Sequence, residues 1–388
     1  MKRAFLIPVF FLIVSLACSL QKPSPPTPVP RGVLVREIPL SADIMFSSIR
    51  YVLSDPACLD KNYQLKENFL LDGDCGKLIY DPTTSALASP NQLFTMDLET
   101  GKVIQITNTN CLFVSGQVMD SGTVMTNAVC LDDNAADTAV QTEESNLYLL
   151  SLDTGEMKCL TCKLGLEAIN NPDYSPISGR IVFSARKGGP ASLNHLFTID
   201  PEKNLVQITG DSEYMDFDCS WSEDGSKIVF SRLPAPWFSQ PSQVWLMNSD
   251  GTNMERITVG GGNPNDERPH GGYPIGLDAD PDLSPDNSQI VFSRLKTGME
   301  NEPFGIYELI IIDVRTKEEH LLDSTFANMV PAWKSGGILL LRQLGLANVM
   351  ERRQGIYLYK NGKFEEVEQF PYNVFPIGAY ASSWIELK

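Results

Sequence analysis

The amino-acid sequence predicts an all-β protein, a β-propeller built from four-stranded antiparallel blades. Three observations predict this fold class: one hairpin motif recurs along the chain, a second hairpin follows each copy, and successive copies are separated by about 50 residues, a period typical of propeller blades. A chain of 388 residues is also too long for one ordinary single-core domain unless its fold is a repeat or a barrel.

The first hairpin combines an aromatic or apolar residue, a tight polar turn and an apolar run. Its copies are CSWSEDGSKIVFSR (219–232), DLSPDNSQIVFSR (282–294), DYSPISGRIVFSAR (173–186), AWKSGGILLLR (332–342), LLDGDCGKLIYDP (70–82) and the weaker QVMDSGTVMTNAV (117–129). Asn287 stands where Gly225 stands, and asparagine tolerates the left-handed backbone almost as well as glycine. We expect Trp221, Trp333, Leu283 and Tyr174 to pack between blades, and the turn residues Asp224 and Asp286 to cap their hairpins.

The second hairpin completes each four-stranded sheet. Its six copies lie at 93–107, 147–161, 196–209, 244–258, 306–322 and 356–367. Their turns use Gly101, Gly155, Asn204, Gly251, Lys317 and Gly362. Glycine and asparagine supply the positive φ that tight hairpins need.

The number of blades depends on the two ends of the folded part. Residues 375–387 fit another first hairpin, and residues 33–55 contain two strand-like runs. If these ends combine, they form a seventh blade closed by both termini, which would leave no exposed sheet edge. The sequence therefore favours seven blades, with six blades plus peripheral strands as the alternative.

The repeated hairpins resemble those of the TolB-like, or PD40, β-propeller family. The resemblance rests on the aromatic-Ser-Pro-Asp-Gly type of turn, the Ile-Val-Phe-like run, the second strand and the closing Leu-Thr, and it covers residues 67–368. It implies a stand-alone propeller. Members of this family include periplasmic protein-interaction modules, propeller domains of serine peptidases and some glycan-active proteins, so the resemblance is specific for fold and weak for function.

The N-terminus predicts export. A basic start, Met1-Lys2-Arg3, precedes the apolar run 4–17, which is typical of a signal peptide and too short to span a bilayer comfortably. The following Cys18 resembles the lipidated cysteine of a bacterial lipobox, although Ser15 replaces the preferred leucine, so ordinary cleavage remains an alternative. Residues 21–32 are proline-rich and favour an extended stalk.

The predicted organisation is a signal peptide (1–17), a lipidated cysteine with its stalk (18–32) and a propeller (33–388). We expect an extracytoplasmic protein that is lipid-anchored to the cell membrane or the outer membrane. The formal net charge of −17 argues against nucleic acid and acidic lipid head groups as partners. We expect a monomer that touches the membrane only through its anchor and binds a protein, peptide or glycan.

The cysteines agree with an oxidising compartment. Cys111 and Cys130 are equidistant from a turn at Asp120-Ser121, so they would face each other in a hairpin and could form a cross-strand disulfide. Cys58 and Cys75 are the next plausible pair. The Cys159-Leu160-Thr161-Cys162 motif has thioredoxin-like spacing but lies at the end of a strand, so a local disulfide or two separate thiols are favoured over a redox role. Cys219 is expected to be a buried free thiol.

Polar residues at equivalent positions of the first strands form the candidate binding site. They are Asn171, Asp216, Asp218, Asp278 and Asp280, and the long loop 259–282 adds His270. First strands line the central channel of a propeller, and alternate residues of a strand share a face, so these side chains are expected to converge at the channel mouth. Oxygen ligands suit Ca²⁺ or Mg²⁺, with Asp218 and Asp280 as the candidate metal ligands. The alternative is a solvated acidic rim without a ligand.

Catalytic signatures are absent from the sequence. There is no Gly-x-Ser-x-Gly elbow, no His-Glu-x-x-His and no phosphate-binding loop. We therefore expect no certain cofactor and favour a binding module over an enzyme. The alternative is a polysaccharide lyase or hydrolase that uses His270 and the aspartates at the channel mouth.

Overall fold

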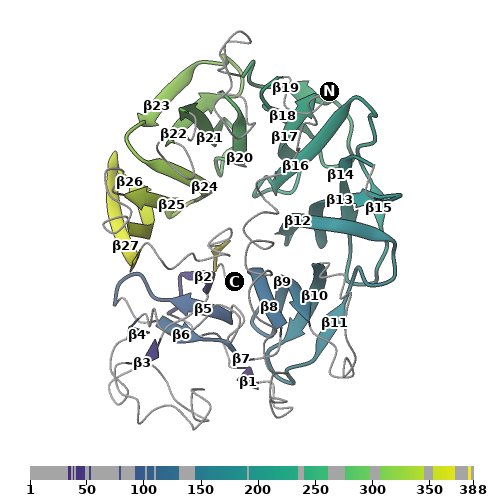
Figure 1. Ribbon diagram of the computed structural model, residues 1–388, viewed down its shortest axis with the longest axis vertical. Helices are drawn as coiled ribbons and strands as arrows, with labels where there is room; N and C mark the ends of the chain where they lie inside the picture. Colours follow the sequence, from purple (N-terminus) through teal and green to yellow (C-terminus); the bar gives the residue numbers. More distant parts are fainter. Residues whose placement is uncertain are drawn as a thin grey trace, which may run out of the picture.

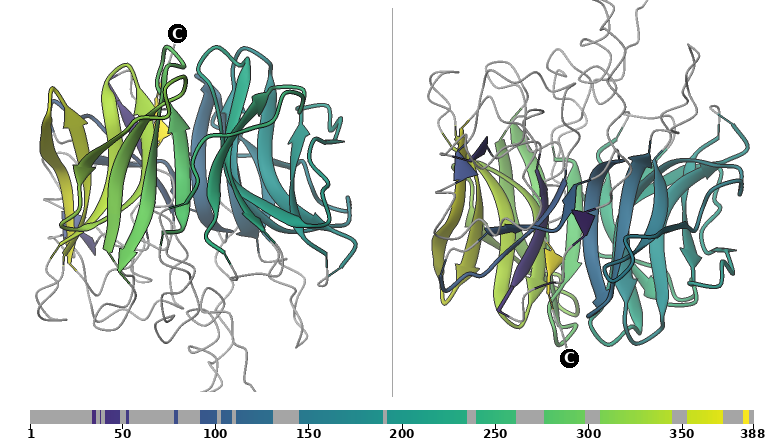
Figure 2. Two further views of the ribbon diagram at one scale, coloured as in Figure 1. Left: turned by 90° about the horizontal axis from the view of Figure 1, so that it is seen from above. Right: turned by 90° about the horizontal axis from the view of Figure 1, so that it is seen from below.

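The computed structural model describes residues 34–35, 38, 41–48, 52–53, 78–79, 92–100, 103–108, 111–130, 145–189, 192–234, 240–260, 276–297, 306–344, 353–371 and 383–385. These residues form six four-stranded antiparallel sheets and two two-stranded ones. The four-stranded sheets stand around a common axis as the blades of a propeller (Figure 1). Seen from the side, the strands run between the two faces of the ring (Figure 2).

Five of the four-stranded sheets are built from consecutive strands. Their bounds are β8 (Cys111–Asp120), β9 (Thr123–Cys130), β10 (Asn146–Ser151), β11 (Met157–Cys159), β12 (Leu166–Ser175), β13 (Arg180–Lys187), β14 (Asn194–Ile199), β15 (Val206–Gln207), β16 (Tyr214–Trp221), β17 (Lys227–Pro234), β18 (Gln243–Asn248), β19 (Glu255–Arg256), β20 (Asp278–Leu283), β21 (Gln289–Thr297), β22 (Ile306–Asp313), β23 (Glu319–Asp323), β24 (Ala327–Lys334), β25 (Gly337–Leu344), β26 (Arg353–Lys360) and β27 (Lys363–Pro371). The first strand of each sheet, β8, β12, β16, β20 or β24, lies nearest the centre (Figure 1).

The sixth four-stranded sheet joins the two ends of the folded chain. Its order is β28 (Ser383–Trp384), β2 (Ile44–Ser48), β5 (Gln92–Met96) and β6 (Val103–Gln105). Ile44 of β2 pairs with Trp384 on one side and with Met96 on the other. Apolar side chains of β2 and β5 then pack against those of β25 and β26, which closes the ring.

The predicted seventh blade is wrong for the described residues. The terminal strands β2 and β28 join the sheet that already holds the 93–107 hairpin instead of forming a sheet of their own. The 70–82 motif therefore does not supply the first hairpin of that sheet. Its described part, β4 (Leu78–Ile79), pairs with β3 (Val52–Leu53), and β1 (Leu34–Val35) pairs with β7 (Thr107–Asn108).

The core consists of layers between neighbouring blades. The recurrent apolar run is fully buried: Ile228, Val229 and Phe230 have no exposed surface. Trp221 is 2% exposed and packs with side chains of β13 and β14 in the preceding blade. Leu283, Tyr174 and Trp333 pack in the equivalent layers, so the prediction that these residues serve blade-to-blade packing is confirmed.

The described turns follow the predicted chemistry with one exception, and Gly101 lies outside the described residues. Gly225 and Asn287 both have positive φ, 68° and 60°, as the motif comparison predicts. In the 196–209 hairpin, however, the positive φ belongs to Lys203 and not to Asn204, because Asn204 bonds back to Asp200. Asp224 accepts hydrogen bonds from the hydroxyl of Ser222 and the backbone N–H of Ser226, which confirms its role as a hairpin cap.

The cysteines of the described residues are buried or bridged. Cys159 and Cys162 form a disulfide with a Cα–Cα distance of 5.8 Å, which is one of the two alternatives that the sequence leaves open. Cys219 is a buried free thiol, as predicted. Cys111 is disulfide-bonded and lies opposite Cys130 in the β8–β9 register, the arrangement that the predicted bridge needs. The side chain of Cys130 is outside the described residues, as are Cys58, Cys75 and Cys18.

No helix long and apolar enough to cross a membrane occurs in the part of the chain that the structure describes. The predicted signal peptide and stalk lie outside that part, so both remain predictions.

The closing strand makes a contact that can be tested. The indole N–H of Trp384 donates to the carbonyl oxygen of Ala332 at 3.2 Å, and a methyl group on Gly336 would lie 2.7 Å from the indole ring. Gly336→Ala should displace Trp384 and lower the free energy of unfolding by about 1–3 kcal/mol, the usual cost of overpacking. Urea denaturation measures this loss. Gly122→Ala is the control, because its methyl would meet only carboxylate oxygens at 3.7 Å. Equal midpoints for the two variants would contradict the assigned contact.

Candidate functional site

The innermost strands share a bulge at the predicted site. The pairing register shifts between Phe217 and Ser220 in β16 and between Ala279 and Asp282 in β20. Similar shifts occur in β12 and β24. The residue at each bulge has positive φ: Asn171 (48°), Asp218 (48°), Asp280 (50°) and Val330 (51°). A bulge changes the direction of the side chain relative to the regular alternation of a strand.

The bulges connect neighbouring blades. The backbone N–H of Asp280 donates to Oδ2 of Asp218 at 3.3 Å, and the N–H of Val330 donates to Oδ2 of Asp280 at 3.2 Å. The structure therefore brings Asp218 and Asp280 together, as the sequence predicts. Both are half-buried, and the second oxygen of each carboxylate makes no hydrogen bond with a described residue.

The carboxyls of Asp218 and Asp280, at the two bulges, have raised pKa values. Burial raises the pKa of Asp280 to about 6. Burial and the neighbouring charge of Asp280 raise the pKa of Asp218 well above its usual range. No lysine, arginine or histidine of the described residues contributes to either shift. This pair of acids therefore lacks a counter-charge within the described part of the molecule.

Asp216 and Asp278 are placed elsewhere, within their own blades. Oδ1 of Asp216 accepts from Nε of Arg232 at 2.6 Å, and Oδ1 of Asp278 accepts from Nε of Arg294 at 2.6 Å. Both carboxylates are fully buried. Burial opposes the ionisation of Asp216, but the neighbouring His195 and the hydrogen bonds and charge of Arg232 outweigh it and lower the pKa of Asp216. Burial raises the pKa of Asp278 despite Arg294.

The sequence contains a signal for these two arginine partners, which the motif analysis missed. The apolar run ends in Ser-Arg in both blades, and the register places Arg232 opposite Asp216 and Arg294 opposite Asp278. A threonine at the end of the preceding blade adds a second partner, since Oγ1 of Thr258 donates to Oδ2 of Asp278 at 2.5 Å. These aspartates thus connect the end of one blade to the start of the next.

The sequence analysis also missed a second pair of acids, the half-buried Asp173 and the buried Asp282. Oδ2 of Asp173 accepts the backbone N–H of Trp221 at 2.7 Å, and Oδ2 of Asp282 accepts that of Trp333 at 2.6 Å. Ser220 lies between them, and its Oγ is 2.6 Å from Oδ1 of Asp282. Burial raises the pKa of Asp282 to about 6, although the charge of Lys334 opposes the shift. The signal was an aspartate immediately before the aromatic or apolar residue of the motif.

Among the described residues, Asp218 and Asp280 are two carboxylates that could bind a cation, but they do not make a complete set of ligands. No group of three or more histidine, cysteine, aspartate or glutamate side chains suited to a metal occurs among them. Calcium takes about 6–8 oxygen ligands, so Asp218 and Asp280 alone would supply a minority of them. His195 contacts Asp216 and His320 lies on the outer strand β23, whereas His270 lies outside the described residues.

Comparisons with known proteins find solved structures of similar architecture. No family model matches the sequence. TolB from Acinetobacter baumannii superposes with a TM-score of 0.51 at 15% identity, covering 85% of this chain and 63% of that one. A putative TolB from Agrobacterium tumefaciens gives 0.51 at 16% identity, covering 71% and 87%. Hydrazine synthase from Kuenenia stuttgartiensis gives 0.52 at 15% identity, covering 90% and 48%.

Curated proteins also match in sequence. Among them is an uncharacterized protein from Agrobacterium fabrum, 29% identical over 116 residues, which are 29% of this chain. The match spans 38% of the length of that relative.

Ionisation of Asp280 should make stability depend on pH. Its pKa in the folded protein is about 6 and its ordinary value is 3.8, so the folded state holds the proton more tightly. This contribution to stability is present below pH 3.8 and is lost as the pH rises through about 6. Asp280→Asn, which mimics the protonated acid, should reduce the fall of the urea midpoint between pH 4.5 and 7 and stabilise the protein at pH 7 by about 1–3 kcal/mol.

Asp286→Asn is the matched control for this pH profile. Asp286 lies in an exposed hairpin turn, where hydrogen bonds from Ser284 and Ser288 lower its pKa. Its contribution is therefore present above its ordinary pKa and is lost only in acid. If Asp280→Asn and the wild type give parallel midpoints from pH 4.5 to 7, the assigned ionisation is wrong.

The resemblance predicted from the repeated hairpins is thus confirmed at the level of the fold, and the chain has a TolB-like β-propeller fold.

Proposed function

We propose that this chain is a membrane-tethered, extracytoplasmic propeller that binds a protein or peptide through a positively charged segment at the centre of the ring. The observation that carries the proposal is the Asp218–Asp280 pair. Two half-buried carboxyls lie in contact through a backbone N–H, and no described cation accompanies them.

The same strands show what a carboxylate does here when a guanidinium is present. Two residues earlier, Asp216 and Asp278 each hold an arginine at 2.6 Å. Asp218 and Asp280 have the same acid chemistry without an internal arginine among the described residues. A lysine or arginine of a partner would supply the missing charge and relieve the repulsion between the pair.

The charge of the whole chain favours the same partner. A formal net charge of −17 attracts basic proteins and speeds their encounter with the ring. An uncharged glycan would hydrogen-bond to the carboxyls without supplying a counter-charge, so a protein or peptide is preferred. The enzyme alternative, a polysaccharide lyase or hydrolase, depends on His270, which lies outside the described residues, so it stays a prediction.

Binding of a defined basic peptide tests the proposal. Capped penta-lysine should bind the wild type in a calorimetric titration, and the double variant Asp218→Asn/Asp280→Asn should weaken binding at least tenfold, about 1.4 kcal/mol. The control Asp224→Asn/Asp286→Asn removes the same charge from exposed turns and should bind like the wild type. Equal weakening in both double variants would mean non-specific attraction and would contradict a central site.

The peptide and cation versions of the site are separated by a thermal melt. Calcium or magnesium should leave the melting temperature of the wild type unchanged if Asp218 and Asp280 bind a peptide and not a divalent cation. A rise that the Asp218→Asn/Asp280→Asn variant lacks would show that a divalent cation occupies the pair instead.

The tether is proposed from the sequence around Cys18. Cys18→Ala should move the protein from the membrane fraction to the soluble fraction or block its processing, because the lipid would have no attachment point. Fractionation of expressing bacteria followed by mass analysis of the N-terminal peptide measures both effects. A wild-type protein that is soluble and carries an unmodified N-terminus would exclude lipid anchoring, while leaving the binding proposal intact.

A further inference from the structure

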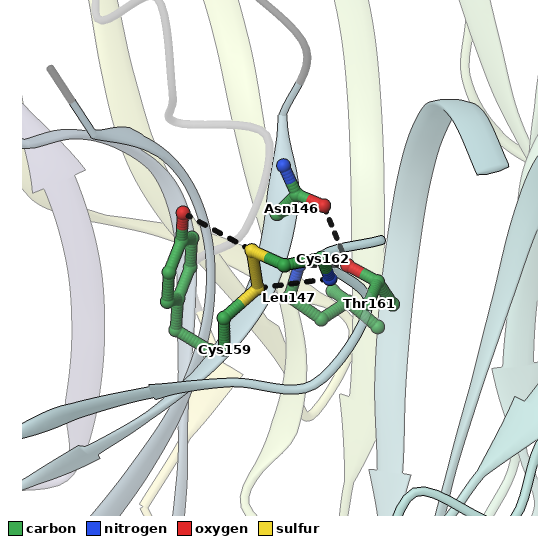
Figure 3. The surroundings of a disulfide bond; sticks show 6 residues. Asn146, Leu147, Cys159, Thr161 and Cys162 are labelled. Atoms are coloured by element: carbon green, nitrogen blue, oxygen red, sulfur yellow. Dashed lines mark hydrogen bonds between the residues drawn. A yellow bond between two sulfur atoms is a disulfide. The ribbon is translucent and has the colours of Figure 1, made fainter. Parts of the chain in front are cut away.

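The Cys159–Cys162 disulfide lies in an unusual local sequence. Lys158 precedes the first cysteine and Lys163 follows the second, so the order is Lys-Cys-Leu-Thr-Cys-Lys in a chain with a formal net charge of −17. The first cysteine ends β11 and the second lies in the turn that follows (Figure 3). Both cysteines are half-buried and both lysines are exposed, so part of the bridge is open to solvent and a lysine flanks it on each side in the sequence.

Hydrogen-bond donors lie next to both sulfur atoms. The backbone N–H of Cys162 donates to Sγ of Cys159 at 3.0 Å (Figure 3). The hydroxyl oxygen of Tyr148 lies 4.0 Å from Sγ of Cys162. A hydrogen-bond donor and a positive charge both favour the thiolate over the thiol, and the thiolate is the species that reacts in exchange. Lys163 adjoins Cys162 in the sequence, whereas Nζ of Lys158 donates to the carbonyl oxygen of Pro201 at 2.7 Å. The site is therefore suited to release a sulfur as an anion.

The two residues between the cysteines hold the motif in place. Leu160 is fully buried, and its N–H donates to the carbonyl oxygen of Leu147 at 2.7 Å. Thr161 is 2% exposed, and its Oγ1 accepts the N–H of Leu147 at 3.0 Å and donates to Asn146 at 2.9 Å (Figure 3). These contacts keep the two cysteine positions together whether or not the sulfurs are bonded.

Sister blades show that this corner does not need a disulfide. Thr209 accepts the N–H of Leu196 at 2.9 Å, and Thr258 accepts that of Val244 at 2.9 Å, in the same way as Thr161. The positions of the two cysteines are taken there by Gln207 and Gly210 and by Arg256 and Val259. A bridge across so short a loop also constrains the unfolded chain least. Structure alone therefore does not explain why the two cysteines are bonded here.

We propose that Cys159 and Cys162 form a thiol–disulfide exchange site that accepts two electrons from a dithiol partner. A thiolate of the partner attacks Sγ of Cys162, and the Cys159–Cys162 bond breaks. Cys159 leaves as a thiolate, receives the hydrogen bond from the N–H of Cys162 and then takes up a proton. The second thiol of the partner attacks the mixed disulfide and releases Cys162, so the partner is oxidised to a disulfide and this chain is reduced to a dithiol.

Alkylation of the folded full-length chain tests the site with dithiothreitol as the dithiol. Trypsin cuts after Lys158 and Lys163, so one peptide, 159–163, reports both cysteines. This peptide should be doubly alkylated at a dithiothreitol concentration that leaves the tryptophan fluorescence native and the Cys111 disulfide intact. Cys219 should stay unlabelled until the protein is unfolded, because it is buried. Reduction of Cys159–Cys162 only on unfolding, or only together with the Cys111 bridge, would overturn the proposal.

The contribution of Lys163 to the exchange is tested by a separate measurement, the rate of reduction of the disulfide. Lys163→Gln should slow reduction by anionic glutathione by about threefold, as expected for removing one charge at a separation of the order of 6 Å in water. Its rate with uncharged dithiothreitol should change less. Lys187→Gln, at an exposed lysine outside the motif, is the matched control and should leave both rates unchanged. Equal slowing by both variants would remove the role assigned to Lys163.

Discussion

The ring depends on hydrogen bonds that pass from the inner strand of one blade to the inner strand of the next. Asp173 and Asp282 each accept the backbone N–H of a tryptophan, Trp221 or Trp333, in the following blade. Gln117 does the same for Tyr174 at 2.7 Å, so a carboxylate is one of two solutions to the same requirement. A sheet edge at the centre of the ring would otherwise bury unpaired N–H groups, which is costly.

Under this constraint the six aspartates of β12, β16 and β20 fall into three groups. Asp173 and Asp282 accept from the next blade, and Asp216 and Asp278 hold arginines of their own blade. Asp218 and Asp280 occupy the bulges between these positions. The first two groups are fully accounted for by contacts that hold the blades together. The bulge pair is the group whose charge is not balanced by any described side chain.

Local sequence signals made most of the fold predictable. The part that was predicted wrongly depends on strands that pair across a long stretch of sequence. Turn residues such as Gly225 and Asn287 and the buried Ile228-Val229-Phe230 run mark hairpins within a few residues of sequence. No such signal joins Ile44 to Trp384, which pair across almost the whole chain, so the closing sheet was misassigned as a seventh blade. At the site, strict alternation places Asp216 and Asp218 on one face. The bulge at Asp218 breaks that alternation, and a bulge has no reliable signature in a single sequence.

Comparison of the four bulges shows that the fold requires the bulge and not the acid. Asn171 and Val330 adopt the same positive φ as Asp218 and Asp280, with an amide and an aliphatic side chain. At Asn171 the contact to the next blade uses the backbone carbonyl, which accepts from Sγ of Cys219 at 3.4 Å. A valine or asparagine therefore suffices, whereas two adjacent half-buried acids repel each other and raise their own pKa values. Groups that a fold tolerates at a cost in stability are concentrated where a protein binds or reacts, and for this reason we propose recognition, and not folding, as the role of the two acids at the centre of the ring.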